Sequence, residues 1–235
     1  MQCSLNTAKQ IPGHEIVEHQ DAFFTWRRWL DCGVLVVPFD VIHIDAHADL
    51  GLGEGGWIYL LSELLALPPA KRSTPRVGTG ALNSANYLAF AIANRWIRKL
   101  TYVFPYRKPR KRRRILMDVY EGDELVRTVP AYATMNEERE PRPSDLMPLL
   151  FHNSDTRTNV IELRHFSPDA VKTLAWATVP PTTIHVEPAV QFEYIQSDRF
   201  RFDGFTHMTV AQSPQYTPAS ADELLPIFRC YFSEV

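Results

Sequence analysis

The chain has 235 residues, of which 45% are hydrophobic and 22% are charged, fractions that are typical of a globular protein rather than a disordered or fibrous one. Its 25 Lys and Arg residues against 27 Asp and Glu residues give a formal charge of −2. This balance excludes a positive field over the whole surface that would attract nucleic acid, but it does not exclude a local basic patch. Three cysteines at unrelated spacings, no apolar segment at the N-terminus and no apolar run of bilayer length predict a cytoplasmic protein that has no membrane partner.

Helical and strand patterns alternate along the first half of the chain. The spacing of aromatic residues predicts a helix over 21–32, a β-branched run predicts a strand over 41–45, and amphipathic spacing predicts a helix over 57–67. The longest predicted helix covers 82–100, with basic residues toward its C-terminal end, and a strand follows over 100–104.

The same alternation returns in the second half. Strands are predicted over 159–163, 183–187 and 206–211. A Ser-Pro-Asp sequence opens a helix over 167–177, and the capping box at 220–223 opens a helix at the C-terminus. Strands that alternate with helices form a parallel sheet covered on both faces, so the pattern predicts the α/β class.

One segment interrupts the alternation. Two runs with strand character, 112–120 and 125–132, flank the turn at 121–124 and predict a β-hairpin. The hairpin lies in an insertion over about 106–155, within what is otherwise a single domain over 1–235.

The segment that suggests a binding or catalytic site is 41–51, where a hydrophobic strand runs directly into Asp-x-His-x-Asp. Ligands bind at the carboxyl ends of strands in open α/β sheets, so Asp45, His47 and Asp49 are expected in a site. Alternate residues of an extended chain point the same way, which predicts that Asp45 and His47 converge. Neighbouring carboxylates need a compensating cation, and two Asp with one His suit Mn²⁺, Fe²⁺ or Zn²⁺. His43 lies deeper in the strand and is predicted to be a packed, hydrogen-bonded core histidine.

Asp45-Ala46-His47-Ala48-Asp49 resembles the metal signature of the arginase and ureohydrolase superfamily. Together with its flanking segments, it resembles the arginase-like branch that contains peptide arginases, which convert arginine side chains of ribosomally made peptides to ornithine. The flanking segments, in chain order, are Val17-Glu18-His19-Gln20-Asp21, Asn86-Tyr87-Leu88-Ala89, Trp96-Ile97 and Ala211-Gln212-Ser213-Pro214-Gln215-Tyr216-Thr217-Pro218.

The resemblance implies a three-layer α/β/α fold with a mainly parallel sheet and a pair of Mn²⁺ ions. It implies His19 as an early metal ligand and Asp45, His47 and Asp49 as central ligands. Hydroxide generated at the metal would attack the guanidinium carbon of arginine, with Asp49 as the proton relay to the departing amine, and urea and ornithine would leave.

Two segments depart from the pattern of the family. His185 and Glu187 replace the Asp-x-Asp that relatives carry on a later strand, with Glu162 as an alternative ligand. A carboxylate can bridge two cations whereas an imidazole binds through one nitrogen, so His185 would weaken, shift or remove the second ion. Gln212 or Ser213 stands where relatives hold the guanidinium with a carboxylate, and neither supplies charge pairing.

The identity of the substrate leaves alternatives. No cluster of polar residues for a free α-carboxylate follows the motif, which favours an arginine-containing peptide over free arginine. The basic run at 107–114 is either a solvated loop or a grip for an acidic stretch of a precursor peptide. Alternative hypotheses for the function are a deacetylase or another guanidine hydrolase of the same fold, and a non-catalytic protein that binds metal or nucleic acid.

Overall fold

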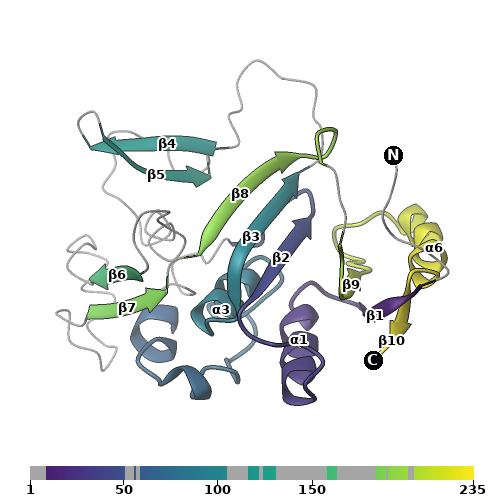
Figure 1. Cartoon of the computed structure of the whole chain (residues 1–235), viewed down its shortest axis with the longest axis horizontal. Helices are drawn as coiled ribbons and strands as arrows, with labels where there is room; N and C mark the ends of the chain where they lie inside the picture. Colours follow the sequence, from purple (N-terminus) through teal and green to yellow (C-terminus); the bar gives the residue numbers. More distant parts are fainter. Residues whose placement is uncertain are drawn as a thin grey trace. The chain divides into compact units, whose positions relative to one another are not determined.

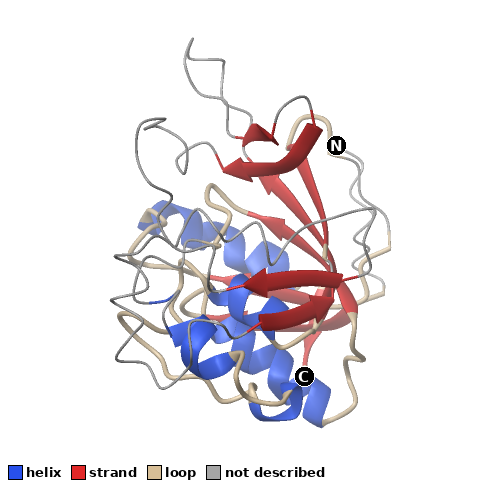
Figure 2. Ribbon diagram, turned by 90° about the vertical axis from the view of Figure 1, so that its left-hand side faces the viewer, coloured by secondary structure: helices blue, strands red, loops and turns tan. Residues whose placement is uncertain are grey.

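The computed structural model describes residues 9–50, 56, 59–104, 116–121, 124–130, 158–162, 184–188, 190–200 and 204–235. The chain divides into two compact units: unit 1 comprises Met1–Val36 with Asp198–Val235, and unit 2 comprises Val37–Ser197. Each unit combines helices with a sheet of parallel strands (Figure 2), which confirms the predicted α/β class. None of the helices in this described part of the chain has the length and apolar character that crossing a bilayer requires.

Unit 1 contains a parallel sheet in the order β10–β1–β9 (Figure 1). Its strands are β1 at Ile11–Ile16, β9 at Met208–Ala211 and β10 at Phe232–Glu234. The close approach of β1 to β10 requires Gly13, because a Cβ atom there would lie 2.5 Å from the side chain of Phe232. Strand β9 confirms the strand predicted over 206–211, in a shorter form.

Helix α1 at Asp21–Asp31 follows β1 and confirms the helix predicted over 21–32. Its aromatic spacing gives the helix an apolar face on which Phe23, Trp26 and Trp29 are all buried. The indole nitrogen of Trp29 donates to the backbone oxygen of Val235 at 3.2 Å, which ties the helix to the strand that ends unit 1.

The C-terminal helix of unit 1 begins differently from its prediction. A 3₁₀ helix, η6, covers Ala219–Leu224 and leads into a short α-helix, α6, at Leu225–Arg229. Pro218 occupies the N-cap position of η6 and no side chain caps it, so the predicted capping box at 220–223 is wrong. A tight 3₁₀ turn satisfies its amides with i→i+3 bonds, which leaves the predicted cap without a role.

Unit 2 contains a second parallel sheet, in the order β2–β3–β8. Its strands are β2 at Phe39–Ile44, β3 at Ile97–Phe104 and β8 at Gln191–Gln196. Strand β2 confirms the strand predicted over 41–45. Val41 and His43 on one face of β2 are buried while Ile44 on the other face is exposed, so β2 alternates rather than being buried throughout.

The helix predicted over 82–100 is wrong in both of its bounds. The observed helix, α3, covers only Tyr87–Ala93, and every residue in it is buried. A turn precedes it, in which the amide of Asn83 donates to Oδ1 of Asn86 at 2.8 Å. Two residues after the end of the helix, Arg95 has a left-handed φ of 62°, and the amide of Trp96 donates back to the carbonyl of Ala91 at 3.1 Å. Strand β3 therefore starts three residues earlier than predicted.

The helix predicted over 57–67 is confirmed in part: Tyr59 is helical and leads into a π-helix, η1, at Leu60–Leu64. A separate 3₁₀ helix, η2, follows at Pro69–Lys71. Leu60 and Leu64 are buried, as their apolar spacing predicts.

Four further strands of unit 2 form two antiparallel pairs: β4 at Leu116–Glu121 with β5 at Glu124–Pro130, and β6 at Thr158–Glu162 with β7 at Ile184–Pro188. The first pair confirms the predicted hairpin. The second corrects the expectation that these two strands enter a parallel sheet, because a long connection permits either direction of pairing. The predicted helix over 167–177 and the basic run at 107–114 lie outside the described residues.

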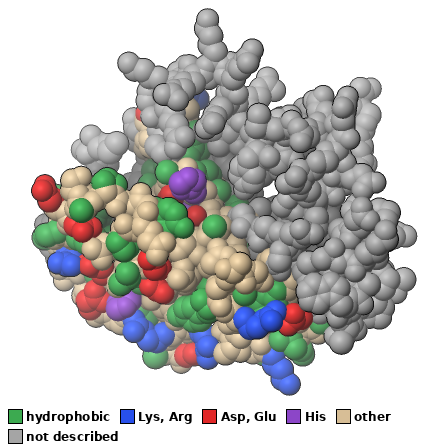
Figure 3. Space-filling model, turned by 180° about the vertical axis from the view of Figure 1, so that it is seen from behind, with side chains coloured by type: hydrophobic (Ala, Val, Ile, Leu, Met, Phe, Trp, Pro, Cys, Tyr) green, Lys and Arg blue, Asp and Glu red, His purple; other side chains and the backbone are tan. Residues whose placement is uncertain are grey.

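Basic and acidic side chains of the described residues are interspersed on the face that Figure 3 draws. This mixture agrees with the near-balanced formal charge of −2.

Candidate metal centre

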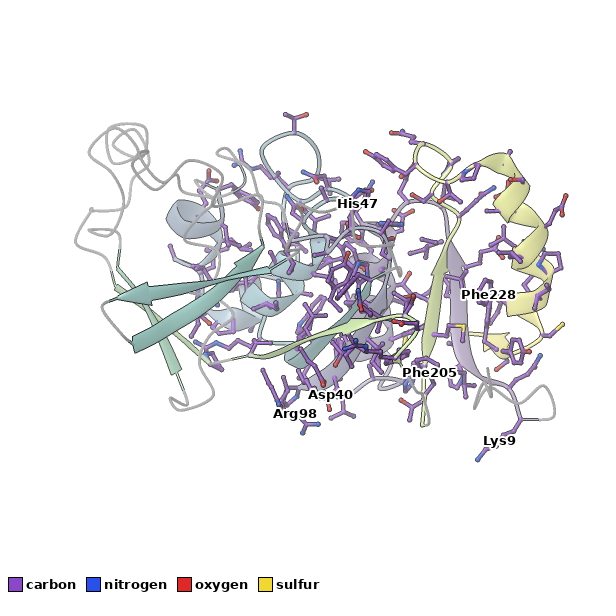
Figure 4. The ribbon with its side chains drawn as sticks, turned by 90° about the horizontal axis from the view of Figure 1, so that it is seen from above. Lys9, Asp40, His47, Arg98, Phe205 and Phe228 are labelled. Carbon is purple, nitrogen blue, oxygen red and sulfur yellow. The ribbon has the colours of Figure 1, made fainter. Side chains whose placement is uncertain are left out.

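The Asp-x-His-x-Asp segment follows β2 at the carboxyl end of that strand. The amide of Asp45 donates to the carbonyl of Val103 of β3 at 3.3 Å, and the chain then turns. Figure 4 shows His47 on the opposite side of this sheet from Asp40 and Arg98. The segment therefore occupies the strand end at which parallel sheets bind ligands.

The turn brings Asp45 and Asp49 together. A carboxylate oxygen of one lies within 4.8 Å of a carboxylate oxygen of the other. Asp49 is 6% exposed and has a left-handed φ of 49°, a conformation that Asp tolerates better than most residues. Two acids held this close repel each other unless a cation lies between them, so the pair can hold a metal ion.

His47 lies beside Asp45 but faces solvent. Its side chain is 74% exposed, and its Nδ1 is 3.8 Å from Oδ1 of Asp45. The same Oδ1 accepts the backbone amide of His47 at 2.8 Å. The extended geometry assumed in the prediction is not realised, because β2 ends at Ile44 and Asp45 caps the turn. A role for His47 as a ligand stays a prediction.

His43 is the packed, hydrogen-bonded core histidine that the sequence predicts. It is 8% exposed, and its ring stacks on Tyr102 of β3 with centroids 5.8 Å apart. Nε2 lies 2.9 Å from the carbonyl oxygen of His47 and 3.4 Å from Oδ2 of Asp49. Because a carbonyl oxygen only accepts hydrogen bonds, Nε2 carries a proton and donates it toward the turn.

Tyr87, the first residue of α3, meets the other nitrogen of the same imidazole. Its hydroxyl lies 3.4 Å from Nδ1 of His43. Burial raises the pKa of Tyr87 well above its ordinary value of 10.0, and the negative charges of Asp49 and Asp45 raise this pKa further. The hydroxyl therefore remains a protonated donor beside the acidic turn. Sequence reasoning gave Tyr87 no role, because nothing local indicates that it reaches His43.

Glu187 has a different set of partners. It is 4% exposed, its Oε1 accepts from Nη1 of Arg72 at 2.9 Å and its Oε2 accepts from Nε of Arg95 at 2.9 Å. Arg72 is itself 4% exposed and also donates to the backbone oxygens of Leu65, Leu67 and Ala93. This arrangement is a buried ion-pair cluster that sequence reasoning missed.

The ligand roles predicted for the late strands stay predictions. His185 lies on β7 opposite Ile161 of β6, and Glu162 pairs with Ile184 in the same ladder. Strand β7 thus pairs with β6, whereas β2 pairs with β3, which in turn pairs with β8.

Unit 1 holds the other predicted site residues. His19 lies in the turn before α1 and is half-buried. The amide of Ser213 donates to the carbonyl of Val17 at 2.7 Å, so the segments 17–21 and 211–218, far apart in sequence, lie side by side. They do so because β1 pairs with β9 in parallel register.

Gln212 and Ser213 differ in how their side chains are satisfied. Nε2 of Gln212 donates to Oδ2 of Asp222 at 3.2 Å. Ser213 is fully buried with a left-handed φ of 52°, and its Oγ has no hydrogen-bond partner among the described residues. A buried hydroxyl of this kind is costly unless a ligand completes it.

No family model matches this chain. No curated protein matches it either. Function is therefore inferred from the side-chain geometry and the sequence motifs.

Proposed function

We propose that this chain is a manganese-dependent hydrolase that converts arginine side chains within a peptide to ornithine and urea. The observation that carries the proposal is the pair of carboxylates, Asp45 and Asp49, within 4.8 Å of each other after a parallel strand. The pair lies in a segment that resembles the arginase signature. The proposal includes the three-layer α/β/α arrangement that this resemblance implies.

Oxygen donors from two Asp side chains fit Mn²⁺, which favours carboxylate ligands. We propose His19 and His47 as nitrogen ligands that complete the coordination of this ion, on the grounds of their positions in the sequence motifs. A second ion would take His185 and Glu187 as ligands. Glu187 would then exchange at least one of its two guanidinium partners for the ion.

The reaction consumes one water and breaks one C–N bond of the guanidinium group. When bound, Mn²⁺ would lower the pKa of water from 15.7 towards about 7 and so would supply hydroxide near neutral pH. Asp49 accepts the proton of the attacking water and passes it to the departing amine, because its carboxylate is an acceptor held in the turn. The oxygen of water ends in urea, and the side-chain nitrogen stays in ornithine.

Gln212 and Ser213 are proposed to hold the substrate. The amide nitrogen of Gln212 donates to Asp222, which directs its amide oxygen to act as an acceptor for a guanidinium N–H. The buried Oγ of Ser213 would gain a partner in the substrate, and leaving such a group unpaired costs about 1–3 kcal/mol.

The direct test is incubation of the purified chain with Mn²⁺ and an arginine-containing peptide, followed by mass spectrometry and a urea assay. We expect each converted arginine to lose CH₂N₂ and to release one urea. Asp49→Asn is the matched control, because Asn tolerates the left-handed backbone but lacks the charge, and we expect no conversion with it. An unchanged peptide in the presence of a metal-loaded wild-type chain would refute the arginine assignment.

One observation favours a second candidate, a deacetylase with the same metal centre. Gln212 offers no negative charge to a guanidinium group, whereas a neutral amide substrate needs none. An acetyl-lysine peptide in the same assay distinguishes the two, because deacetylation releases acetate and no urea.

A further inference from the structure

We propose that His43 and Tyr87 are positioning residues that hold Asp49 in its metal-binding orientation before a metal arrives. This inference rests on the proposed function only in taking Asp49 as a metal ligand. It does not depend on which substrate the chain hydrolyses.

Asp49 needs external support because of its backbone. Its φ of 49° lies in the left-handed region, which is unfavourable for a residue that carries a Cβ atom. Its carboxylate also lies within 4.8 Å of that of Asp45, so the two charges push apart. A turn with both an unfavourable backbone conformation and charge repulsion persists only when neighbouring groups stabilise it.

His43 is placed to supply that support from a rigid strand. Its Nε2 lies 2.9 Å from the carbonyl of His47 and 3.4 Å from Oδ2 of Asp49, so one N–H group reaches both the middle and the end of the turn. The backbone of His43 pairs with that of Tyr102 in the β2–β3 ladder, and their rings stack. The imidazole therefore cannot follow the turn if the turn relaxes.

Tyr87 favours the imidazole tautomer whose Nε2 carries the proton and donates it toward the turn. Its hydroxyl lies 3.4 Å from Nδ1 and its ring packs against the imidazole edge-on, with centroids 6.1 Å apart. A hydroxyl that donates to Nδ1 favours the tautomer with the proton on Nε2, which is the one that donates toward His47 and Asp49. The contacts run from α3 through β2 to the metal-binding turn.

The test measures Mn²⁺ affinity without substrate, by the electron paramagnetic resonance signal of free Mn²⁺ during titration of the full chain. His43→Phe keeps an aromatic ring but removes the donor, and we expect it to weaken Mn²⁺ binding about 10–100-fold, as loss of an outer hydrogen bond to a ligand does. His43→Gln restores an amide donor near the position of Nε2, so it should recover most of the affinity. Tyr87→Phe should give an intermediate loss.

His207→Phe is the matched control, since His207 contacts Trp29 within unit 1 and has no part in the turn. We expect its affinity to equal that of the wild-type chain. Equal affinity in His43→Phe, or a loss in His43→Gln as large as in His43→Phe, would overturn the inference. If His43→Phe does not fold, an unchanged affinity in Tyr87→Phe overturns it instead.

The result is separable from the proposed reaction. A chain that binds Mn²⁺ in a His43-dependent way but leaves arginine peptides intact supports the positioning role and refutes the hydrolase. A wild-type chain that binds no Mn²⁺ overturns the positioning role, whatever its activity.

Discussion

Two buried carboxylates of unit 2, Glu187 and Asp49, have opposite surroundings. Glu187 is 4% exposed and accepts a hydrogen bond from each of two arginines at 2.9 Å. Asp49 is 6% exposed and lies beside the imidazole of His43 and the carboxylate of Asp45. The fold pairs the first acid with two guanidinium groups, and it places the second beside an imidazole and another carboxylate. Burial alone therefore does not distinguish a structural acid from a candidate metal ligand, whereas the charge of the neighbours does.

The largest expected effect comes from breaking the neutralised cluster. Glu187→Gln removes the counter-charge of Arg72, which stays buried, and should lower the free energy of unfolding by about 3–5 kcal/mol. Urea denaturation of the metal-free chain measures this change. A loss indistinguishable from zero would show that the backbone acceptors of Arg72 suffice to hold its charge.

Asp49→Asn is the matching change at the other acid, and it should leave the free energy of unfolding of the metal-free chain unchanged or raise it. The substitution relieves the repulsion with Asp45 and keeps an oxygen near Nε2 of His43, so the metal-free chain should be as stable as wild type or more stable. The same denaturation measurement applies. A destabilisation as large as that of Glu187→Gln would erase the contrast between the two acids.

Tyr87 gives a smaller effect that reports on the surroundings of Asp49 at high pH. Its raised pKa means that the folded chain keeps a proton that the unfolded chain loses above pH 10.0, so stability falls as pH rises through this range. The fall should be steeper in the wild-type chain than in Tyr87→Phe. Denaturation midpoints of both proteins, measured in metal-free buffer from pH 9 upward, check this. Parallel curves would contradict burial of the phenol.

The smallest effect is expected at the opposite end of β2, where Asp40 pairs with Arg98 in the open. The guanidinium group donates to both carboxylate oxygens, at 3.0 and 2.9 Å, but both side chains are solvated. Exposed pairs contribute little because water screens them, so Asp40→Asn should leave the denaturation midpoint unchanged. A marked drop in the denaturation midpoint would mean that the exposure of an ion pair does not indicate how much it stabilises this fold.

The sequence predicts the strand and the acidic turn that carry the candidate site. The β-branched run before Asp45 predicts β2, and the Asp-x-His-x-Asp spacing predicts a cation site at its carboxyl end. Both patterns involve residues that are close in sequence, so they can be recognised without knowledge of tertiary contacts. The helix α1 and the β4–β5 hairpin are predicted for the same reason.

Features that depend on backbone exceptions or distant partners escape prediction. The pattern over 82–100 is helical in periodicity, but an asparagine turn at its start and the left-handed Arg95 at its end confine the helix to Tyr87–Ala93. Asp45 and Asp49 meet through a left-handed turn rather than the extended geometry that paired Asp45 with His47. The partners of Glu187 are 115 and 92 residues away, beyond any spacing rule.

The most direct test of the contrast is isothermal titration of the metal-free chain with Mn²⁺, comparing wild type, Asp49→Asn and Glu187→Gln under conditions in which all three are folded. The wild-type chain should bind Mn²⁺, Asp49→Asn should lose that binding, and Glu187→Gln should retain the ion held by Asp45 and Asp49. Binding that survives in Asp49→Asn, or that is absent from the wild-type chain, would contradict the assignment of a metal centre to the turn after β2.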